Sequence, residues 1–175
     1  MNRSMRLVVI FAVAACAGSQ APKTDMSSSA ASSSAQGAAQ SFHATMDAAS
    51  EVPQPNVGSS TPSCTATFQS DGQTLTYKVD AHGLTSPFAA AHIHVGAPGV
   101  AGPVVAPLTM TDNGNGNASG SGTIDASAIK GKNPDGSPMS MKDVLTLLGS
   151  GNAYVNVHTQ NNKPGECRGQ IQPSR

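Results

Sequence analysis

Three histidines are the residues of this chain whose type and spacing could do chemistry. His92 and His94 alternate with apolar residues in segment 91–95, and His158 ends a second apolar segment, 154–158. In a strand, residues i and i+2 point to the same face, so His92 and His94 share one face and the apolar residues take the other. Copper and zinc accept neutral imidazoles, whereas calcium and magnesium prefer carboxylates. If the two segments are neighbouring strands, the pattern predicts a three-histidine copper site, with zinc as second choice.

A competing interpretation needs no metal, because exposed histidines also hydrogen-bond to nearby loops and backbone groups. Two further histidines, His43 and His82, have no assigned role from their positions. His43 falls on the same non-core register in the first expected strand, which leaves it open as a fourth ligand.

Strands must position these histidines, and apolar residues alternate with polar ones along much of the chain from residue 42 onward. The alternation is clearest in 42–46, 64–68 and 75–81, and Asp71-Gly72 between the last two is a strong hairpin signal. Further strands are expected over 89–95, 103–108, 118–124, 153–158 and 167–171. This pattern predicts an all-β fold: an antiparallel β-sandwich of seven or eight strands in two packed sheets.

One segment has a helical pattern. Ser140 is a suitable N-cap, Asp143 follows three residues later, apolar residues recur at helical spacing, and Gly149 ends the run. We expect one short helix near 140–148, at one end of the sandwich.

The N-terminus is expected to direct export. Arg3 and Arg6 precede an apolar run over 7–15, too short to span a bilayer, which predicts a signal peptide over 1–15. The sequence Val13-Ala14-Ala15-Cys16 is similar to a bacterial lipobox, which predicts cleavage before Cys16 and lipidation of that cysteine. Ordinary signal cleavage, with Cys16 incidental, is the alternative.

The residues after Cys16 are rich in Ser and Ala, especially over 27–39, and offer nothing to bury. We expect a disordered tether over 16–40 and a folded domain over 41–173. Absence of Asp after the cleavage site, where Ala17 stands, is typical of sorting to the outer membrane in Gram-negative bacteria. The sequence thus predicts a cell-envelope lipoprotein bound to the membrane through its N-terminal lipid.

Two cysteines remain in the expected domain, Cys64 and Cys167, both in expected strands and both in a compartment that permits disulfides. A disulfide between them is predicted. Two buried free thiols are the alternative, and a thiol enzyme is less favoured because no histidine adjoins either cysteine.

Charged residues are few and balanced. Ten basic and ten acidic residues give a formal charge of zero, and no basic cluster appears, which excludes nucleic acid as an expected partner. Glu51 and Glu166 are expected either to orient the imidazoles or to pair with Arg168, and the salt bridge is the favoured role.

Several motifs resemble the CHRD domain, the module named for chordin and common in exported bacterial proteins. They are Phe42-His43-Ala44-Thr45-Met46 with Glu51-Val52-Pro53, Ala91-His92-Ile93-His94 with Gly102-Pro103-Val104-Val105, Tyr154-Val155-Asn156-Val157-His158-Thr159, and Pro164-Gly165-Glu166-Cys167-Arg168-Gly169-Gln170-Ile171. The resemblance covers about residues 41–172 and implies a β-sandwich outside the cytoplasm, without a defined activity. The family usually has an aliphatic residue where Cys167 stands, which strengthens the disulfide prediction.

A weaker resemblance is to Cu/Zn superoxide dismutase, also a β-sandwich with a His-x-His strand. No histidine lies between His94 and His158, so a two-metal site of that kind is not expected. No other catalytic motif is present, and the residues favour binding over catalysis. We expect a membrane-tethered envelope module that binds copper or zinc. The alternatives are a metal-free module that binds a protein or glycan partner, and a copper-dependent oxidoreductase.

Overall fold

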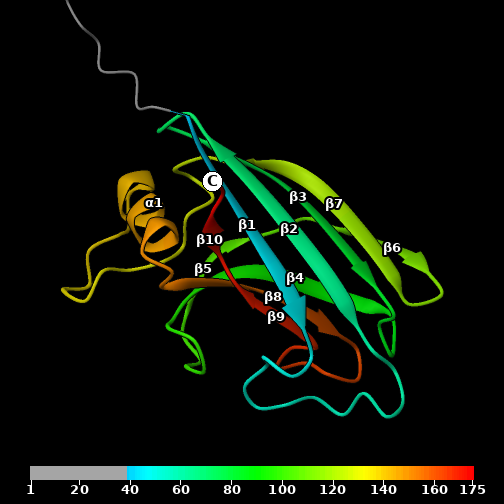
Figure 1. The fold of residues 1–175 in the computed structure, drawn as a ribbon. Helices are drawn as coiled ribbons and strands as arrows, with labels where there is room; N and C mark the ends of the chain where they lie inside the picture. Colours follow the sequence, from blue (N-terminus) through cyan, green and yellow to red (C-terminus); the bar gives the residue numbers. More distant parts are fainter. Residues whose placement is uncertain (1–38) are drawn as a thin grey trace, which may run out of the picture. The chain divides into compact units, whose positions relative to one another are not determined.

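The computed structural model describes residues 39–175, which form the domain shown in Figure 1. The signal peptide expected over 1–15, the lipidation site Cys16 and nearly all of the tether expected over 16–40 lie outside the described residues.

The described residues form ten strands and one helix. They are β1 (Gln40–Asp47), β2 (Ser63–Ser70), β3 (Leu75–His82), β4 (Phe88–Val95), β5 (Val104–Pro107), β6 (Thr111–Gly114), β7 (Asn117–Ile124), α1 (Met141–Gly149), β8 (Ala153–Thr159), β9 (Cys167–Gln170) and β10 (Gln172–Pro173). All eight expected strands and the expected helix are present, so the all-β prediction is confirmed. The two short strands β6 and β10 were not expected, and they bring the number of strands to ten instead of seven or eight.

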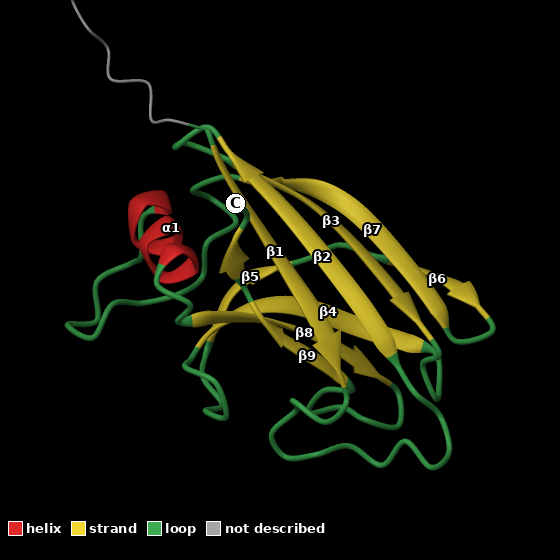
Figure 2. Cartoon of the chain, in the orientation of Figure 1, coloured by secondary structure: helices red, strands yellow, loops and turns green. Residues whose placement is uncertain are grey.

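The strands pair in the order β5-β4-β8-β9-β1-β2-β3-β7-β6, with β10 beside β1, and every pairing is antiparallel. The strands form the two layers of a sandwich (Figure 2). One layer contains β1, β2, β3 and β7, and the other contains β4, β8 and β9. The expectation of two separate sheets is wrong. β9 pairs with β1 at Asp47 and Arg168, so one sheet curls over and packs against itself.

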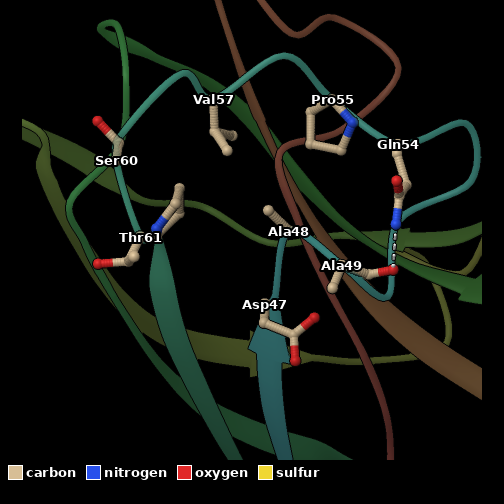
Figure 3. A pocket seen from close by; sticks show the side chains of 9 residues that line it. Asp47, Ala48, Ala49, Gln54, Pro55, Val57, Ser60 and Thr61 are labelled. Atoms are coloured by element: carbon tan, nitrogen blue, oxygen red, sulfur yellow. Dashed lines mark hydrogen bonds between the residues drawn. The ribbon is translucent and has the colours of Figure 1, made fainter.

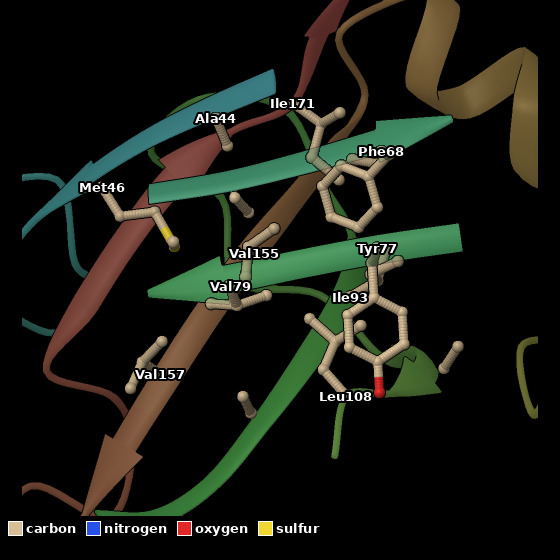
Figure 4. Close-up of a cluster of buried hydrophobic side chains, with 14 of the residues drawn as sticks. Ala44, Met46, Phe68, Tyr77, Val79, Ile93, Leu108, Val155, Val157 and Ile171 are labelled. Atoms are coloured by element: carbon tan, nitrogen blue, oxygen red, sulfur yellow. The ribbon is translucent and has the colours of Figure 1, made fainter. Parts of the chain in front are cut away.

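The core lies between the two layers and follows the alternation of the sequence. In β1, β2 and β3 every second residue is buried. Phe68 and Tyr77 from one layer pack near Ile93 and Val155 from the other (Figure 4). The Tyr77 hydroxyl accepts a hydrogen bond from the Thr109 backbone N–H at 2.8 Å, which satisfies the polar end of this buried ring.

The helix α1 begins as predicted. The Ser140 side chain accepts from the Asp143 backbone N–H, and the Asp143 carboxylate accepts from the Ser140 backbone N–H, which makes a capping box. Met141, Val144 and Leu148 are its buried residues, and it packs against β8 and β10. Within residues 39–175 no helix has the length and apolarity needed to cross a membrane.

A disulfide joins Cys64 of β2 to Cys167 of β9, as predicted. Both residues are fully buried, and 103 positions separate them in the sequence. The bond therefore connects the two layers through the core and holds β9, the strand next to β8, against the opposite layer.

Candidate metal centre

Strands β4 and β8 are direct neighbours, which is the condition that the sequence left open. In their register His94 lies opposite Tyr154, His92 opposite Asn156, and Ala90 opposite His158. His158 is therefore diagonal to His92, and diagonal pairs lie within reach of long side chains. The structure brings the three histidines to one face of the β4–β8 pair.

The three imidazoles converge closely. One nitrogen from each of His92, His94 and His158 lies within 4.8 Å of the other two. His92 Nδ1 and His158 Nε2 are 3.0 Å apart, and the ring centroids of His92 and His94 are 5.6 Å apart in an edge-to-face arrangement. His94 is 8% exposed, and the other two are partly buried, so the cluster opens to solvent on the side of His92 and His158.

Backbone carbonyls orient two of the rings. His158 Nδ1–H donates to the Lys163 carbonyl at 2.8 Å, and His94 Nδ1–H donates to the Gly102 carbonyl at 2.9 Å. Each ring therefore presents Nε2 as its lone-pair nitrogen. His94 Nε2 is buried and has no hydrogen-bond partner. Because His158 Nε2 is an acceptor, the proton between it and His92 belongs to His92 Nδ1.

The backbone of residue 102 can approach β4 closely enough to bind His94 only because this residue is glycine. A Cβ at this position would overlap the Val95 carbonyl of β4. The close approach lets its carbonyl meet His94, and its N–H donates to the Tyr154 hydroxyl at 3.1 Å.

The environment keeps the imidazoles neutral, which is the form that binds metal. Burial lowers the pKa of His92 to about 4, and repulsion from His158 and His94 adds to this shift. Burial also lowers the pKa of His94 and of His158, although their hydrogen bonds to carbonyls oppose the shift.

The Tyr154 ring packs between His94 of the cluster and Arg168 of β9. Its ring stacks on His94 with centroids 4.9 Å apart and 12° between planes. The Arg168 guanidinium carbon lies 3.6 Å from the centroid of the same ring. Because β8 lies between β4 and β9, His94 and Arg168 approach the tyrosine from opposite sides.

The expected salt bridge of Arg168 with Glu51 or Glu166 is not formed. Within residues 39–175 the sole ion pair joins Lys78 and Asp80. Glu166 instead accepts hydrogen bonds from Thr85, Thr159 and Asn162, and Arg168 donates to backbone carbonyls. Uncharged donors surround the Glu166 carboxylate, and backbone carbonyls accept from Nη2 of Arg168, so neither group forms an ion pair.

Nor do the two carboxylates orient an imidazole: among the described residues neither hydrogen-bonds to a histidine. Glu51 Oε1 accepts from the Val52 backbone N–H at 2.9 Å. Burial raises the pKa of Glu51, although that hydrogen bond, the charge of Arg168 and the Asn156 side chain oppose the shift.

The remaining histidines lie outside the cluster. His43, exposed on β1, is 3.4 Å from Ser174 Oγ, and His82 Nδ1 is 2.8 Å from Asn117 Oδ1. A pocket of about 360 Å³ at the β1–β2 loop also lies apart from the cluster, and no histidine lines it (Figure 3). Mainly small and apolar side chains such as Ala48, Pro55 and Val57 surround this pocket.

Sequence reasoning missed Tyr154 and Asn156 as members of the site. Both precede His158 at alternate positions in one strand, so the same period of two places all three on one face. Both side chains are 2% exposed. The strand β8 is therefore buried on both faces, by the core on one face and by loops on the other.

Comparison with known proteins gives one match. The family model described as the CHRD domain matches residues 42–171, which is most of the chain. No curated protein and no solved structure matches the chain. The resemblance to Cu/Zn superoxide dismutase therefore receives no support from these comparisons.

Proposed function

The chain belongs to the CHRD family, and from that premise we propose that it is an exported binding module that holds one copper ion on His92, His94 and His158. Zinc is the second choice. The family and the disulfide both fit a protein that works outside the cytoplasm. A lipid on Cys16 would hold this module at the membrane surface, in the outer membrane of a Gram-negative envelope.

One observation carries the proposal: His94 Nε2 is buried without a hydrogen-bond partner, beside two other imidazoles. An unsatisfied buried polar atom costs about 1–3 kcal/mol. A metal ion shared with His92 and His158 would use this lone pair and remove that cost. The Gly102 carbonyl fixes the tautomer that directs the lone pair this way.

The geometry is compatible with one ion. With metal–nitrogen bonds of about 2.0–2.1 Å, two tetrahedral ligands lie about 3.3 Å apart. His92 Nδ1 and His158 Nε2 are already 3.0 Å apart. An ion that replaces the hydrogen bond between them requires the other tautomer of His92, with its proton on Nε2 instead of Nδ1. The ligand nitrogen of His94 lies within 4.8 Å of the other two and must move closer. Imidazole nitrogens bind copper more tightly than zinc in the usual order of divalent metals.

Three protein ligands leave a coordination position open toward solvent, because His92 and His158 are only partly buried. An open position allows a second ligand to approach and exchange the ion. This arrangement suits buffering or delivery of copper in the envelope better than permanent structural binding.

The proposal is tested by metal analysis of the purified exported chain, with melting temperature measured in the presence and absence of a chelator. We expect stoichiometric copper and a lower melting temperature after chelation, because a ligand that binds only the folded state stabilises it. His94→Ala removes both effects, whereas His43→Ala, at an exposed histidine outside the cluster, keeps them. No stoichiometric metal and no chelator effect would favour the metal-free interaction module instead.

A further inference from the structure

A second pocket, of about 270 Å³, lies between the loop that follows β1 and the loop that follows β4. Val52, Pro98 and Gly99 are among the loop residues that line it, and Gln170 and Arg168 come from β9. Arg168 is the one charged residue of this lining. It is 1% exposed, so the pocket contains a nearly fully buried cation.

The contacts of Arg168 leave one end of its guanidinium free. Nη2 donates to the Ala97 carbonyl at 3.0 Å and to the Val100 carbonyl at 2.9 Å, and one face of the group covers the Tyr154 ring. Nη1 is buried and has no hydrogen-bond partner. A buried charge is costly unless its donors are satisfied, so Nη1 is a site where an acceptor would bind favourably.

Glu51 is the carboxyl group that faces this guanidinium, from the loop after β1. It forms no ion pair with Arg168, and its Oε1 accepts from the Val52 N–H. Burial raises the pKa of Glu51, although the charge of Arg168 opposes this shift. Among the described residues, no carboxylate lies within ion-pair distance of Arg168.

One exposed apolar side chain lines this pocket, and a second belongs to a residue that contacts Arg168. In the part of the chain that the structure describes, Val52 at 37% and Val100 at 53% are the large hydrophobic side chains that are exposed. Val52 lines the pocket, and the carbonyl of Val100 binds the same guanidinium. Exposed apolar side chains beside a buried cation suit a ligand with one anionic and one aliphatic end.

We propose that this pocket binds a small aliphatic carboxylate. A carboxylate oxygen accepts a charge-assisted hydrogen bond from Arg168 Nη1, and the aliphatic part contacts Val52 of the lining and extends toward the exposed Val100, whose carbonyl binds the same guanidinium. The volume suits only a few heavy atoms, as in a short branched acid or the C-terminal residue of a peptide that ends in valine. The site is independent of the copper site, although Tyr154 contacts both Arg168 and His94.

The test is a methyl NMR titration of the exported chain with isovalerate and with N-acetylglycylvaline, each against its neutral amide at constant ionic strength. We expect saturable shifts of the Val52 and Val100 methyl groups with a millimolar Kd for a carboxylate and at least tenfold weaker binding of its amide. Saturation by isovalerate alone identifies a free acid as ligand, and saturation by the peptide alone identifies a chain terminus. Thermal melts of every variant check that it is folded.

Val100→Glu supplies the decisive variant, because it adds a negative charge at an exposed position and leaves the core intact. We expect it to weaken carboxylate binding at least tenfold, whereas Thr67→Glu, the same added charge at an exposed position of β2, has no effect. Equal binding of carboxylate and amide, no saturation, or equal affinities of Val100→Glu and the parent chain would each overturn the proposal.

Discussion

Glu166→Gln is the substitution that most directly links the stability of this fold to its histidine site. Glu166 is fully buried, and four donors surround its carboxylate. The Thr85 N–H donates to Oε1 at 2.7 Å, while Thr85 Oγ1, Thr159 Oγ1 and Asn162 Nδ2 donate to Oε2 at 2.7, 2.6 and 2.7 Å. These contacts hold the loop between β8 and β9, whose Lys163 carbonyl orients His158.

The amide of glutamine keeps one acceptor oxygen and directs an NH₂ group at a remaining donor. At least one charge-assisted hydrogen bond is lost, and such a bond contributes about 1.5–3 kcal/mol to stability. One donor is also left buried without an acceptor. We expect the free energy of unfolding to fall by about 3 kcal/mol at pH 7. Because the Lys163 carbonyl also loses its support, copper affinity should fall about 10-fold to 100-fold.

The pH dependence follows from the pKa of Glu166. Burial alone would raise this pKa, but the hydrogen bonds from Thr159, Asn162 and Thr85 outweigh it and hold the pKa below its usual value. The carboxylate therefore stabilises the fold above the pKa of an unfolded glutamate, about 4.3, and this contribution is lost as pH falls toward the folded pKa. The stability difference between parent and variant should be constant near neutral pH and shrink below about pH 4.

Urea denaturation from pH 7 to pH 3 measures this difference. Asp80→Asn is the matched control, since it makes the same chemical change in an ion pair with Lys78 at 2.8 Å, and surface pairs contribute only about 0–1 kcal/mol. A loss below about 1 kcal/mol for Glu166→Gln, or a difference that stays constant down to pH 3, would refute the reasoning.

Three further predictions concern the stability of other parts of the fold. Replacing both Cys64 and Cys167 by Ala removes a bond that closes 103 residues, which should cost about 4–5 kcal/mol in urea denaturation; an unchanged midpoint would contradict this. Gly165→Ala places a Cβ against Glu51 and should cost at least about 2 kcal/mol, whereas Gly58→Ala, at positive φ but in open space, should cost about 1 kcal/mol. Ser140→Ala removes the N-cap of α1 and should lower stability by about 1 kcal/mol in thermal or urea denaturation, and no change would show the cap to be unimportant.

The sequence predicts the strands of this fold well where one face is buried. In β1 the buried residues Phe42, Ala44 and Met46 alternate with exposed ones, so the period of two is visible. Strand β6 could not be found this way, because Thr111–Gly114 is exposed throughout and has no alternation. The single curled sheet was also beyond prediction, since it depends on the pairing of Asp47 with Arg168, two residues far apart in the chain.

For the candidate site, the sequence predicts which side chains share a face but not which strands are neighbours. The shared face of His92 and His94 follows from local spacing, whereas the approach of His158 depends on the β4–β8 pairing. The hydrogen-bond partners of Arg168 could not be predicted from the sequence either. They are carbonyls of the loop after β4, about 70 positions away, and backbone groups carry no residue-type signal in a sequence.

The most direct test of the metal site is a copper titration of the exported chain in competition with free histidine, repeated with single histidine variants. We expect one equivalent of copper to be bound more tightly than by free histidine. We also expect that His92→Ala, His94→Ala and His158→Ala each abolish this binding, while His43→Ala and His82→Ala do not. Binding no tighter than that of free histidine, or full uptake by His92→Ala, would contradict the assignment of these three imidazoles as a metal site.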